Sequence, residues 1–256
     1  MLRNKQNVFI SGVSRGIGKE LSLYHLRKGD HVYGVSRSIN KELLEFSNFH
    51  YISLDLSKTE LINPCLDAFL SFDKELVFER IYLNAGLIDD IYKISEIDIS
   101  KFNYILSVNL IAYKQILDFF IHHDLIQIKE VVVSASIAGV RPRAGMSAYA
   151  VSKSALNMLM SLYAIENPSI FFVVVGLCIF DSVVSQKLSH DNRKIKYFGE
   201  LEALASRFKK QGYLVSAEER KNDLIYVLDH LSELNISSGV FFEIRDMLKL
   251  NSHIDS

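Results

Sequence analysis

The chain has 256 residues, 49% of them hydrophobic and 11% aromatic, enough to bury the core of a single α/β domain spanning residues 1–256. Its 29 basic and 30 acidic residues are interspersed, so we expect no nucleic-acid partner. The two cysteines lie far apart, which argues against zinc or another metal and favours a reducing, cytoplasmic setting. The N-terminus lacks a signal-peptide pattern and no run reaches the ~20 apolar residues of a membrane span, so no membrane association is expected.

Short runs of β-branched and aromatic residues alternate with longer amphipathic segments. Because most of these runs lack polar alternation, they are predicted to be strands buried on both faces of a parallel sheet. The order indicates a doubly wound, seven-stranded, mostly parallel Rossmann-type α/β sheet with helices on both faces and ligands beyond the carboxyl ends of the strands. The expected strands are residues 7–10, 31–36, 50–53, 80–83, 130–134, 170–175 and 239–244, and the expected helices are 16–28, 58–72, 98–124, 147–167 and 217–234.

A glycine-rich stretch, "SGVSRGIG" at 11–18, follows the first expected strand and opens the first helix. Its glycines permit a tight turn and a close approach of the backbone to a phosphate, whose charge the helix N-terminus stabilises. Placement directly after the first strand indicates a dinucleotide site. The residues of this loop assigned to the cofactor are Gly12, Ser14, Arg15, Gly16, Ile17 and Gly18.

The end of the second strand indicates which dinucleotide is bound. Folds that prefer NAD usually carry an acidic residue there, whereas this chain has neutral Ser36 followed by Arg37. Arg37 and Arg15 are predicted to bracket a 2′-phosphate, each charge-assisted bond contributing roughly 1.5–3 kcal/mol, which favours NADP(H). The alternative is that both are solvated surface charges. Asp55 and Leu56, after the third strand, are expected beside the adenine.

Two tyrosine–lysine pairs have the same four-residue spacing. Tyr24 and Lys28 lie at the far end of the first helix and are interpreted as a surface pair. Tyr149 and Lys153 open the helix after the fifth strand, at the carboxyl edge, and project from one helix face. A free tyrosine titrates at about pH 10. Because a nearby ammonium favours the phenolate, we expect Lys153 to lower the pKa of Tyr149 and make it an acid–base group.

Two further polar residues are expected near this pair. Ser136 follows the fifth strand, where its hydroxyl can hold a substrate oxygen. Asn109 interrupts the helix before that strand, where it can bind water and pass protons to Lys153. Taken singly, Ser136 can also be a turn residue and Asn109 a packing amide; the convergence of all four residues favours catalysis.

The motifs "SGVSRGIG", "LNAG" (83–86), "SVN" (107–109), "SASIAG" (134–139) and "YAVSK" (149–153) together resemble the short-chain dehydrogenase/reductase family. The resemblance covers residues 7 to about 175 and is closest to the single-domain members. It implies that Tyr149 is the general acid and that Lys153 lowers its pKa and binds the nicotinamide ribose. It also implies that Ser136 orients the carbonyl and Asn109 completes the proton relay. The further cofactor-lining residues expected are Asn84, Ala85, Gly86, Gly176 and Ile179.

Within the family, "HVYGVSRS" (31–38) and "SSGVFFEIRDML" (237–248) are most similar to the sepiapterin and benzil reductases. One departure follows the sixth strand, where the family has Pro-Gly and then a hydroxyl residue that holds the nicotinamide carboxamide. Here Val175 replaces the proline and Phe180 occupies the hydroxyl position. One inserted residue would let Asp181 and Ser182 take that role; otherwise cofactor docking is weakened.

The expected function is NADPH-dependent reduction of a small ketone or diketone. The alternatives are oxidation of a sugar, steroid or other secondary alcohol, and a non-catalytic NADP(H)-binding protein. Residues 181–216 are expected to form a substrate lid. Arg141 and Arg143 are expected near the entrance of the substrate pocket, where they either meet an anionic substrate or face solvent. The apolar stretch 156–165 is expected to be buried, either in the core or against a second subunit. The family resemblance implies pairing through this helix and the helix at 98–124, so a homodimer or homotetramer is expected.

Overall fold

The computed structural model describes residues 5–71, 75–88, 90–190, 195–208, 210 and 213–251. Within them, seven strands form one wholly parallel sheet in the order β3-β2-β1-β4-β5-β6-β7, which confirms the predicted Rossmann-type α/β fold. The strand order reverses direction between β1 and β4, the point at which such sheets open a ligand crevice. The strands are β1 (Asn7–Ser11), β2 (His31–Ser36), β3 (Phe49–Ser53), β4 (Leu76–Leu83), β5 (Ile126–Ala135), β6 (Phe171–Gly176) and β7 (Phe241–Glu243).

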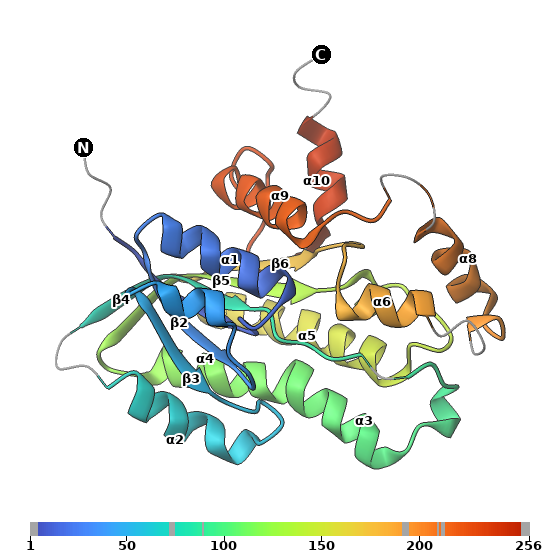
Figure 1. Cartoon of the computed structure of the whole chain (residues 1–256), viewed down its shortest axis with the longest axis horizontal. Coiled ribbons are helices and arrows are strands. Elements are labelled where there is room, and N and C mark those ends of the chain that lie inside the picture. Colours follow the sequence, from blue (N-terminus) through green and yellow to red (C-terminus); the bar gives the residue numbers. More distant parts are fainter. Residues whose placement is uncertain are drawn as a thin grey trace.

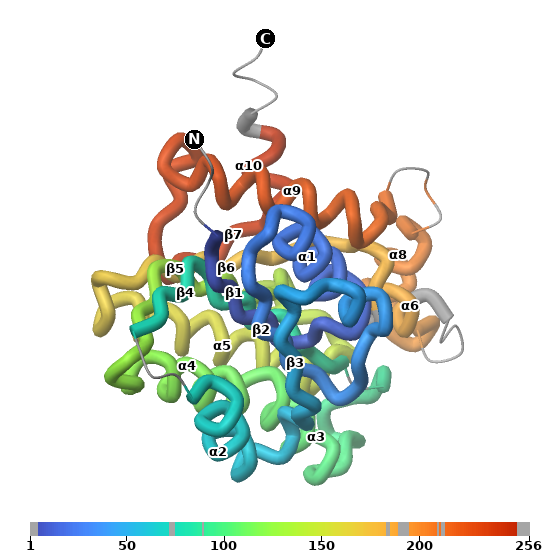
Figure 2. The backbone as a smooth tube through the Cα atoms, turned by 60° about the vertical axis from the view of Figure 1, so that its left-hand side comes forward, coloured from blue at the N-terminus to red at the C-terminus, as the bar shows by residue number. Residues whose placement is uncertain are grey.

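Helices cover both faces of the sheet, as Figures 1 and 2 show from two directions. One face carries α1 (Gly16–Arg27), α9 (Ala217–Asp229) and α10 (Ile244–Asn251). The other carries α2 (Thr59–Phe69), α5 (Ser147–Glu166) and a long helix in which α3 (Ile99–Leu106) passes through a π-helical turn (Ser107–Ile111) into α4 (Ala112–His122). At one end of the sheet, α6 (Val183–His190) and α8 (Gly199–Phe208) lie to the side of both layers (Figure 1). Short 3₁₀ turns occupy Lys41–Glu45, Ile94–Glu96 and Ile137–Gly139.

The two helical layers close two hydrophobic cores, one on each face of the sheet. On β1, Val8 and Ile10 face the α1/α9 layer and Phe9 faces the α4/α5 layer, and all three are fully buried. Each such side chain contributes roughly 1.5–3 kcal/mol when it is removed from water. Burial on both faces explains why the strand sequences are continuously apolar.

Several element boundaries differ from the sequence prediction. β4 and β5 begin four residues earlier than expected. Charged residues such as Glu79 and Lys129 interrupt the apolar pattern in their first halves, and for this reason the prediction left these halves out. In the sheet, Glu79 and Lys129 form an ion pair across the two strands. β7 is only three residues long because α10 begins at Ile244, and neither α10 nor α6 was predicted. The helix expected at 217–234 ends at Asp229. The helix expected at 58–72 ends at Phe69, and residue 72 lies outside the described part of the chain.

The long helix from Ile99 to His122 corrects one statement drawn from the sequence. It has 24 residues and contains an 18-residue window with a mean hydropathy of 1.3, so it could cross a membrane by length and composition, although no such stretch was expected. Its inner side is packed into the core, with Ala112, Ile116 and Phe120 fully buried. Core helices of this kind meet the same criterion, so the observation is weak support for a membrane span.

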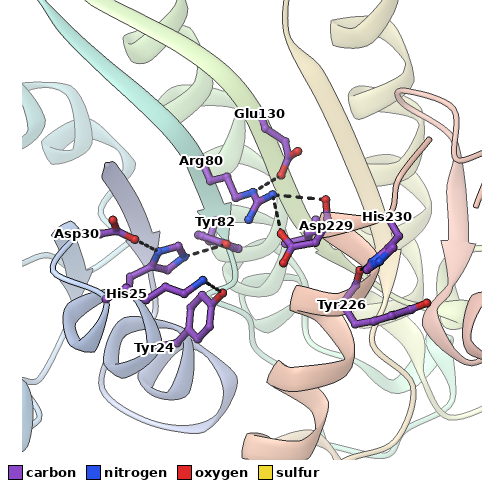
Figure 3. A network of polar contacts seen from close by, with 11 residues as sticks. Tyr24, His25, Asp30, Arg80, Tyr82, Glu130, Tyr226, Asp229 and His230 are labelled. Atoms are coloured by element: carbon purple, nitrogen blue, oxygen red, sulfur yellow. Dashed lines mark hydrogen bonds and ion pairs between the residues drawn. The ribbon is translucent and has the colours of Figure 1, made fainter. Parts of the chain in front are cut away.

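A polar network is buried under α1 and α9 on the first face (Figure 3). The ring of His25 contacts Asp30 through Nδ1 (2.8 Å) and the hydroxyl of Tyr82 through Nε2 (3.0 Å). Arg80 donates from Nε to Glu130 (2.6 Å), and its Nη2 lies 3.8 Å from Asp229. We call these groups the buried network; they tie α1, β4, β5 and α9 together.

Candidate active site

A cleft of about 1190 Å³ opens at the carboxyl ends of the strands. The chain segments that leave β1, β2, β3, β4 and β5 meet there, together with the loop after β6. Most of the predicted residues line this cleft: Gly12, Ser14, Arg15, Gly16, Ile17, Ser36, Arg37, Asp55, Leu56, Asn84, Ala85, Gly86, Ser136, Tyr149, Lys153 and Ile179. Three predicted residues, Gly18, Asn109 and Gly176, lie behind the wall of the cleft. The structure thus brings together residues that are more than a hundred positions apart in the chain.

The glycine loop is shaped by steric requirements that differ at each glycine. Gly12 and Gly16 have φ of +83° and +58°, a region that side chains other than glycine rarely adopt. A Cβ on Gly18 would stand 2.2 Å from the carbonyl oxygen of Gly12, so this residue lets α1 approach the loop. The space around Gly16 is open for at least 4 Å. The first two glycines give the turn, and the third fixes the helix behind it.

The N-terminus of α1 is left available to an anion. Its capping residue, Arg15, makes no side-chain hydrogen bond to the helix, and the first turn contains no acidic residue. The free N–H groups and the positive end of the helix dipole therefore point into the cleft without an internal partner. This arrangement, with the open space at Gly16, fits the pyrophosphate of a dinucleotide.

The ends of β1, β4 and β5 are joined by hydroxyl groups that sequence reasoning missed. Ser11 accepts hydrogen bonds from the backbone N–H of Asn84 (2.9 Å) and of Ala85 (3.2 Å). Ser134 donates to the side chain of Asn84 (3.0 Å), and Tyr113 donates to the carbonyl of Ala85. A serine that ends a buried strand beside the glycine loop is the signal that could have indicated Ser11. These bonds hold the 84–86 segment against the cleft.

The two arginines assigned to the 2′-phosphate line the same end of the cleft. Both Arg15 and Arg37 are exposed, and neither forms an ion pair within 4.0 Å among the described residues. Arg37 donates from Nη1 to the hydroxyl of Tyr104 (3.3 Å), while Ser36 is buried and donates to the carbonyl of Ser38 (2.7 Å). Two guanidinium groups without a carboxylate partner are thus available to an anionic ligand.

The first turns of α5 place Tyr149 and Lys153 against the cleft. Both are nearly buried, with 7% and 4% of their surface exposed, but each contributes to the cleft lining. Lys153 donates from Nζ to the carbonyl of Ser134 (2.7 Å) and lies 5.9 Å from the centre of the Tyr149 ring. A hydrogen bond joins the hydroxyl of Ser136 to that of Tyr149. Three of the four predicted catalytic residues therefore converge.

The electrostatics of this group differ from the sequence expectation. Burial raises the pKa of Tyr149, and the hydrogen bond from Ser136 opposes this only in part. Burial also lowers the pKa of Lys153 to about 8. The pKa of Tyr149 is therefore raised, whereas the sequence led us to expect a lowered one. The physical reason is that desolvation of the buried phenol is the largest influence on its pKa, while the ammonium of Lys153 donates to the Ser134 carbonyl.

Asn109 lies in the π-helical turn and is fully buried. Its side chain accepts from the backbone N–H of Leu87 (2.8 Å) and donates to the carbonyl of Leu87 (2.8 Å) and to Ser152 on α5 (3.0 Å). The side-chain amide is thus occupied by protein groups, and it ties the 84–88 loop to α5. A proton relay through Asn109 stays a prediction.

The loop after β6 departs from the family pattern in conformation as well as in sequence. Val175 is buried inside β6, and Gly176 packs against the ring of Phe241. Cys178 adopts a positive φ of 55°. Beyond it, Asp181 and Ser182 line the cleft, and Ser182 accepts from the backbone N–H of Ser185 at the start of α6 (3.3 Å). A hydroxyl group is therefore supplied to the cleft two positions later than the family pattern has it.

The predicted lid, 181–216, contains α6 and α8; residues 191–194, 209 and 211–212 lie outside the described part. Leu188 of α6 and Leu201 and Leu204 of α8 pack in one cluster with Met146 and Tyr149. Lys187 of α6 forms an ion pair with Asp90 (2.7 Å) in the loop after β4. These contacts place an apolar wall beside Tyr149.

The second tyrosine–lysine pair lies away from the cleft. Lys28 donates to the hydroxyl of Tyr24 at the C-terminal end of α1, where the pair is exposed. Neither residue lines the cleft. Among the described residues, no group of three histidine, cysteine, aspartate or glutamate side chains gathers where it could hold a metal ion.

With this geometry in place, the comparison with known proteins defines the class. Residues 6–193 match the short chain dehydrogenase family, and the chain belongs to it. Members of this family are oxidoreductases that use nicotinamide cofactors, and the cleft with its open helix N-terminus fits such a group.

Particular relatives agree with the subgroup resemblance. The chain is 27% identical to an uncharacterized oxidoreductase of Schizosaccharomyces pombe, over 83% of this chain and 86% of the relative. It is 27% identical to a benzil reductase ((S)-benzoin forming) of Bacillus cereus, over 82% and 89%. It is 28% identical to an NADPH-dependent pterin aldehyde reductase of Arabidopsis thaliana, over 68% and 72%. The likeness to benzil and pterin reductases is thereby confirmed.

Solved structures confirm the fold. A short chain dehydrogenase family protein of Francisella tularensis superposes with a TM-score of 0.76 at 20% identity, covering 94% of this chain and 97% of that one. A short chain dehydrogenase of Shigella flexneri, solved in complex with NADP, superposes with a TM-score of 0.69 at 19% identity, covering 95% and 98%.

Proposed function

We propose that the protein reduces a small ketone or diketone to an alcohol, with NADPH as the reductant. The observation that carries this proposal is the convergence of Ser136, Tyr149 and Lys153 on the wall of one cleft that also receives the glycine loop. The bound cofactor supplies the hydride. Ser136 and Tyr149 present two hydroxyl groups to the carbonyl oxygen, and Tyr149 gives it a proton as the alcohol forms.

Lys153 has two tasks in this proposal. Its ammonium donates to the carbonyl of Ser134 and lies beside Gly86, where it would hold the ribose of a bound nicotinamide cofactor. Its pKa of about 8 lies close to neutrality, so it exchanges protons in the working pH range and can restore the proton that Tyr149 has given away. Asn109 holds Lys153 and the segment after β4 in place relative to each other, because its side chain bonds to Leu87 of that segment and to Ser152 of α5.

The preference for NADPH is part of the proposal. It is supported by the two exposed guanidinium groups of Arg15 and Arg37 and by the absence of an acidic residue at the end of β2. A relative at 28% identity is named as NADPH-dependent. We expect kcat/KM for NADPH to exceed that for NADH at least about tenfold, since one bond of ~1.4 kcal/mol suffices. Equal values would refute the assignment.

Tyr149→Phe tests the function directly. The oxidation of NADPH is followed with a panel of ketones and diketones, and the binding of NADPH is measured by fluorescence. We expect turnover to fall by about 10²–10⁴-fold while cofactor binding is kept. Tyr24→Phe, which changes the tyrosine of the other pair with the same spacing, is the matched control and should leave turnover unchanged. Equal activity of Tyr149→Phe and the unaltered enzyme would overturn the mechanism, and binding without any turnover would favour a non-catalytic NADP(H)-binding protein.

We also propose that the protein forms a homodimer through α5 and the long helix. An apolar face of α5 is exposed, with Met158, Leu162 and Ile165 at 63%, 48% and 77%, and Ile111 of the long helix is exposed as well. We propose a second copy of this chain as the occupant, because these exposed apolar side chains lie on two neighbouring helices of the same layer and a second copy would bury both sets at once. Light scattering of Met158→Lys should show a monomer; an unchanged mass would refute this interface.

A further inference from the structure

The far end of the cleft carries an unusual number of arginines. Arg141 and Arg143 lie in the loop between β5 and α5, Arg207 lies on α8, and Arg245 lies on the first turn of α10. The sheet order places β7 and α10 on the opposite side of β1 and β4 from β2 and Arg37. This second group of guanidiniums is therefore separate from the pair assigned to the cofactor, and it lines the same cleft as Tyr149.

The charges on the wall of the cleft are not balanced. Three acidic side chains, Asp55, Asp181 and Glu243, line it against seven basic ones, although the whole chain has a formal net charge of -1. All three acidic groups already have partners: Asp55 accepts from the backbone N–H of Ser57 (3.0 Å), Asp181 accepts from Gln186 (3.0 Å), and Glu243 lies 3.5 Å from the thiol of Cys178. Within the described residues, none of the four distal arginines forms an ion pair within 4.0 Å.

The positive charge of Arg143 lies in an electrostatically unfavourable environment. It is only partly exposed, and its pKa is lowered first by burial and then by the neighbouring guanidinium of Arg141. Glu200, Glu243 and Tyr213 act on it in the opposite direction, but from beyond ion-pair distance. Two like charges held together at the mouth of a partly desolvated cleft are stabilised when an anion binds between them.

A neighbouring arginine is fixed in orientation. Arg245 stacks over the ring of Tyr213 (4.7 Å to the ring centre) and donates from Nη2 to the carbonyl of that residue (3.1 Å). A guanidinium held in this way loses little freedom when it binds a ligand, which favours recognition of a planar or tetrahedral group of oxygens.

We infer that the substrate is a carbonyl compound that carries an anionic oxygen group, a carboxylate or a phosphate, bound by Arg143 together with Arg141. The carbonyl meets Tyr149 and Ser136, and the anion lies toward the mouth of the cleft. This rests on the proposed function, since it names the substrate class of the same site. It also distinguishes this chain from a reductase of neutral diketones, the class that the names of two relatives suggest.

The test compares three ketones of one shape: 4-methylacetophenone, 4-acetylbenzoate and 4-acetylphenyl phosphate. With NADPH, kcat/KM for at least one of the two anionic ketones should exceed that for the neutral ketone at least about tenfold, and which one gains more tells carboxylate from phosphate. In Arg143→Gln this preference should be lost through a higher KM for the anion, with the neutral ketone unchanged. Arg27→Gln, an exposed arginine on α1, is the matched control and should keep the preference.

Each result decides one of the two proposals. Equal kcat/KM for the neutral and anionic ketones, or an equal loss for both in Arg143→Gln, would overturn the anionic substrate and leave the reductase function standing. If no ketone is reduced, the reductase function fails. Calorimetry of 4-acetylbenzoate and 4-acetylphenyl phosphate on the NADPH-loaded protein then decides the anion site: binding of either that is weakened about tenfold in Arg143→Gln supports it, and no such difference refutes it.

Discussion

The wall of the cleft that carries Ser136, Tyr149 and Lys153 contains the same kinds of residue as the buried network under α1. Each combines a buried tyrosine with a cation from another position: Tyr149 with Lys153 in the cleft, and Tyr82 with Arg80 in the network. Burial raises the pKa of both phenols. The two regions differ in what their polar atoms contact. In the network, the hydroxyl of Tyr82 contacts His25, His25 contacts Asp30, and Arg80 donates to Glu130 (Figure 3). Tyr149 and Ser136, by contrast, line an open cleft.

The comparison teaches that neither residue type nor a shifted pKa identifies a catalytic group by itself. Position at the carboxyl edge of the sheet, beside the glycine loop, makes the difference. The same chemistry enclosed between two helices holds the fold together. Substitutions at matched positions in the two regions should therefore have opposite effects on activity and stability.

The largest difference is expected between the two tyrosines. Tyr149→Phe should lower turnover by about 10²–10⁴-fold, whereas Tyr82→Phe should leave turnover unchanged. Tyr82→Phe removes the hydroxyl that contacts His25 Nε2 and leaves a buried nitrogen without a partner, which should lower the free energy of unfolding by about 1–3 kcal/mol. Urea unfolding and steady-state kinetics measure the two effects. If Tyr82→Phe loses turnover under conditions in which the variant is fully folded, the proposed separation of catalytic and structural roles is contradicted.

The next effect concerns the cation of the buried network. Glu130→Gln removes the carboxylate that lies 2.6 Å from Arg80, whose side chain is only 17% exposed, and leaves the guanidinium with only the more distant and more exposed carboxylate of Asp229 (3.8 Å). We expect the free energy of unfolding to fall by about 3 kcal/mol with little change in kcat.

Glu79→Gln is the control for that substitution. It removes an exposed ion pair with Lys129 between the same two strands. Surface pairs of this kind contribute about 0–1 kcal/mol. If both glutamate variants lose the same stability, the burial of Arg80 has no special consequence.

A smaller effect should appear in the pH dependence of stability. The pKa of Lys153 is lowered by burial from 10.5 to about 8, so between these values the unfolded chain holds a proton that the native state has released. Stability contributed by this group should therefore rise with pH between about 8 and 10.5, by up to roughly 1.4 kcal/mol per pH unit. Below pH 8 both states hold the proton and the slope vanishes.

Lys153→Met isolates this contribution. Urea unfolding of the cofactor-free proteins is measured at pH 7.5, 8.5 and 9.5. The unaltered protein should gain free energy of unfolding relative to the variant as the pH rises, so that the excess stability of the variant narrows. A gap that is constant across this range would mean that Lys153 keeps its usual pKa in the fold.

The smallest effect is expected at the cofactor end. Arg37→Gln removes a guanidinium that lines the cleft and donates a hydrogen bond to the hydroxyl of Tyr104. The preference of kcat/KM for NADPH over NADH should fall about tenfold, with the reaction on NADH unchanged. Arg27→Gln, outside the cleft, should leave the preference intact. A loss of activity with both cofactors would point to a structural role of Arg37 instead.

Much of this arrangement could be predicted from the sequence, because parallel strands and glycine loops leave strong local patterns. Gly12 and Gly16 were found since only glycine fits their backbone, and Tyr149 since it opens the helix after a buried strand. The direction of the Tyr149 pKa was missed, because burial is a property of the assembled wall and not of spacing along a helix. The same holds for the partners of Arg80 and Asn109, which come from positions far along the chain.

The saturated amide of Asn109 has a consequence for engineering. Since this one side chain is bonded to Leu87 and to Ser152, the segment after β4 is not an independent module. A graft of that segment from another dehydrogenase would have to carry its own matching amide and hydroxyl, or the transplanted loop would lose its register with the catalytic helix.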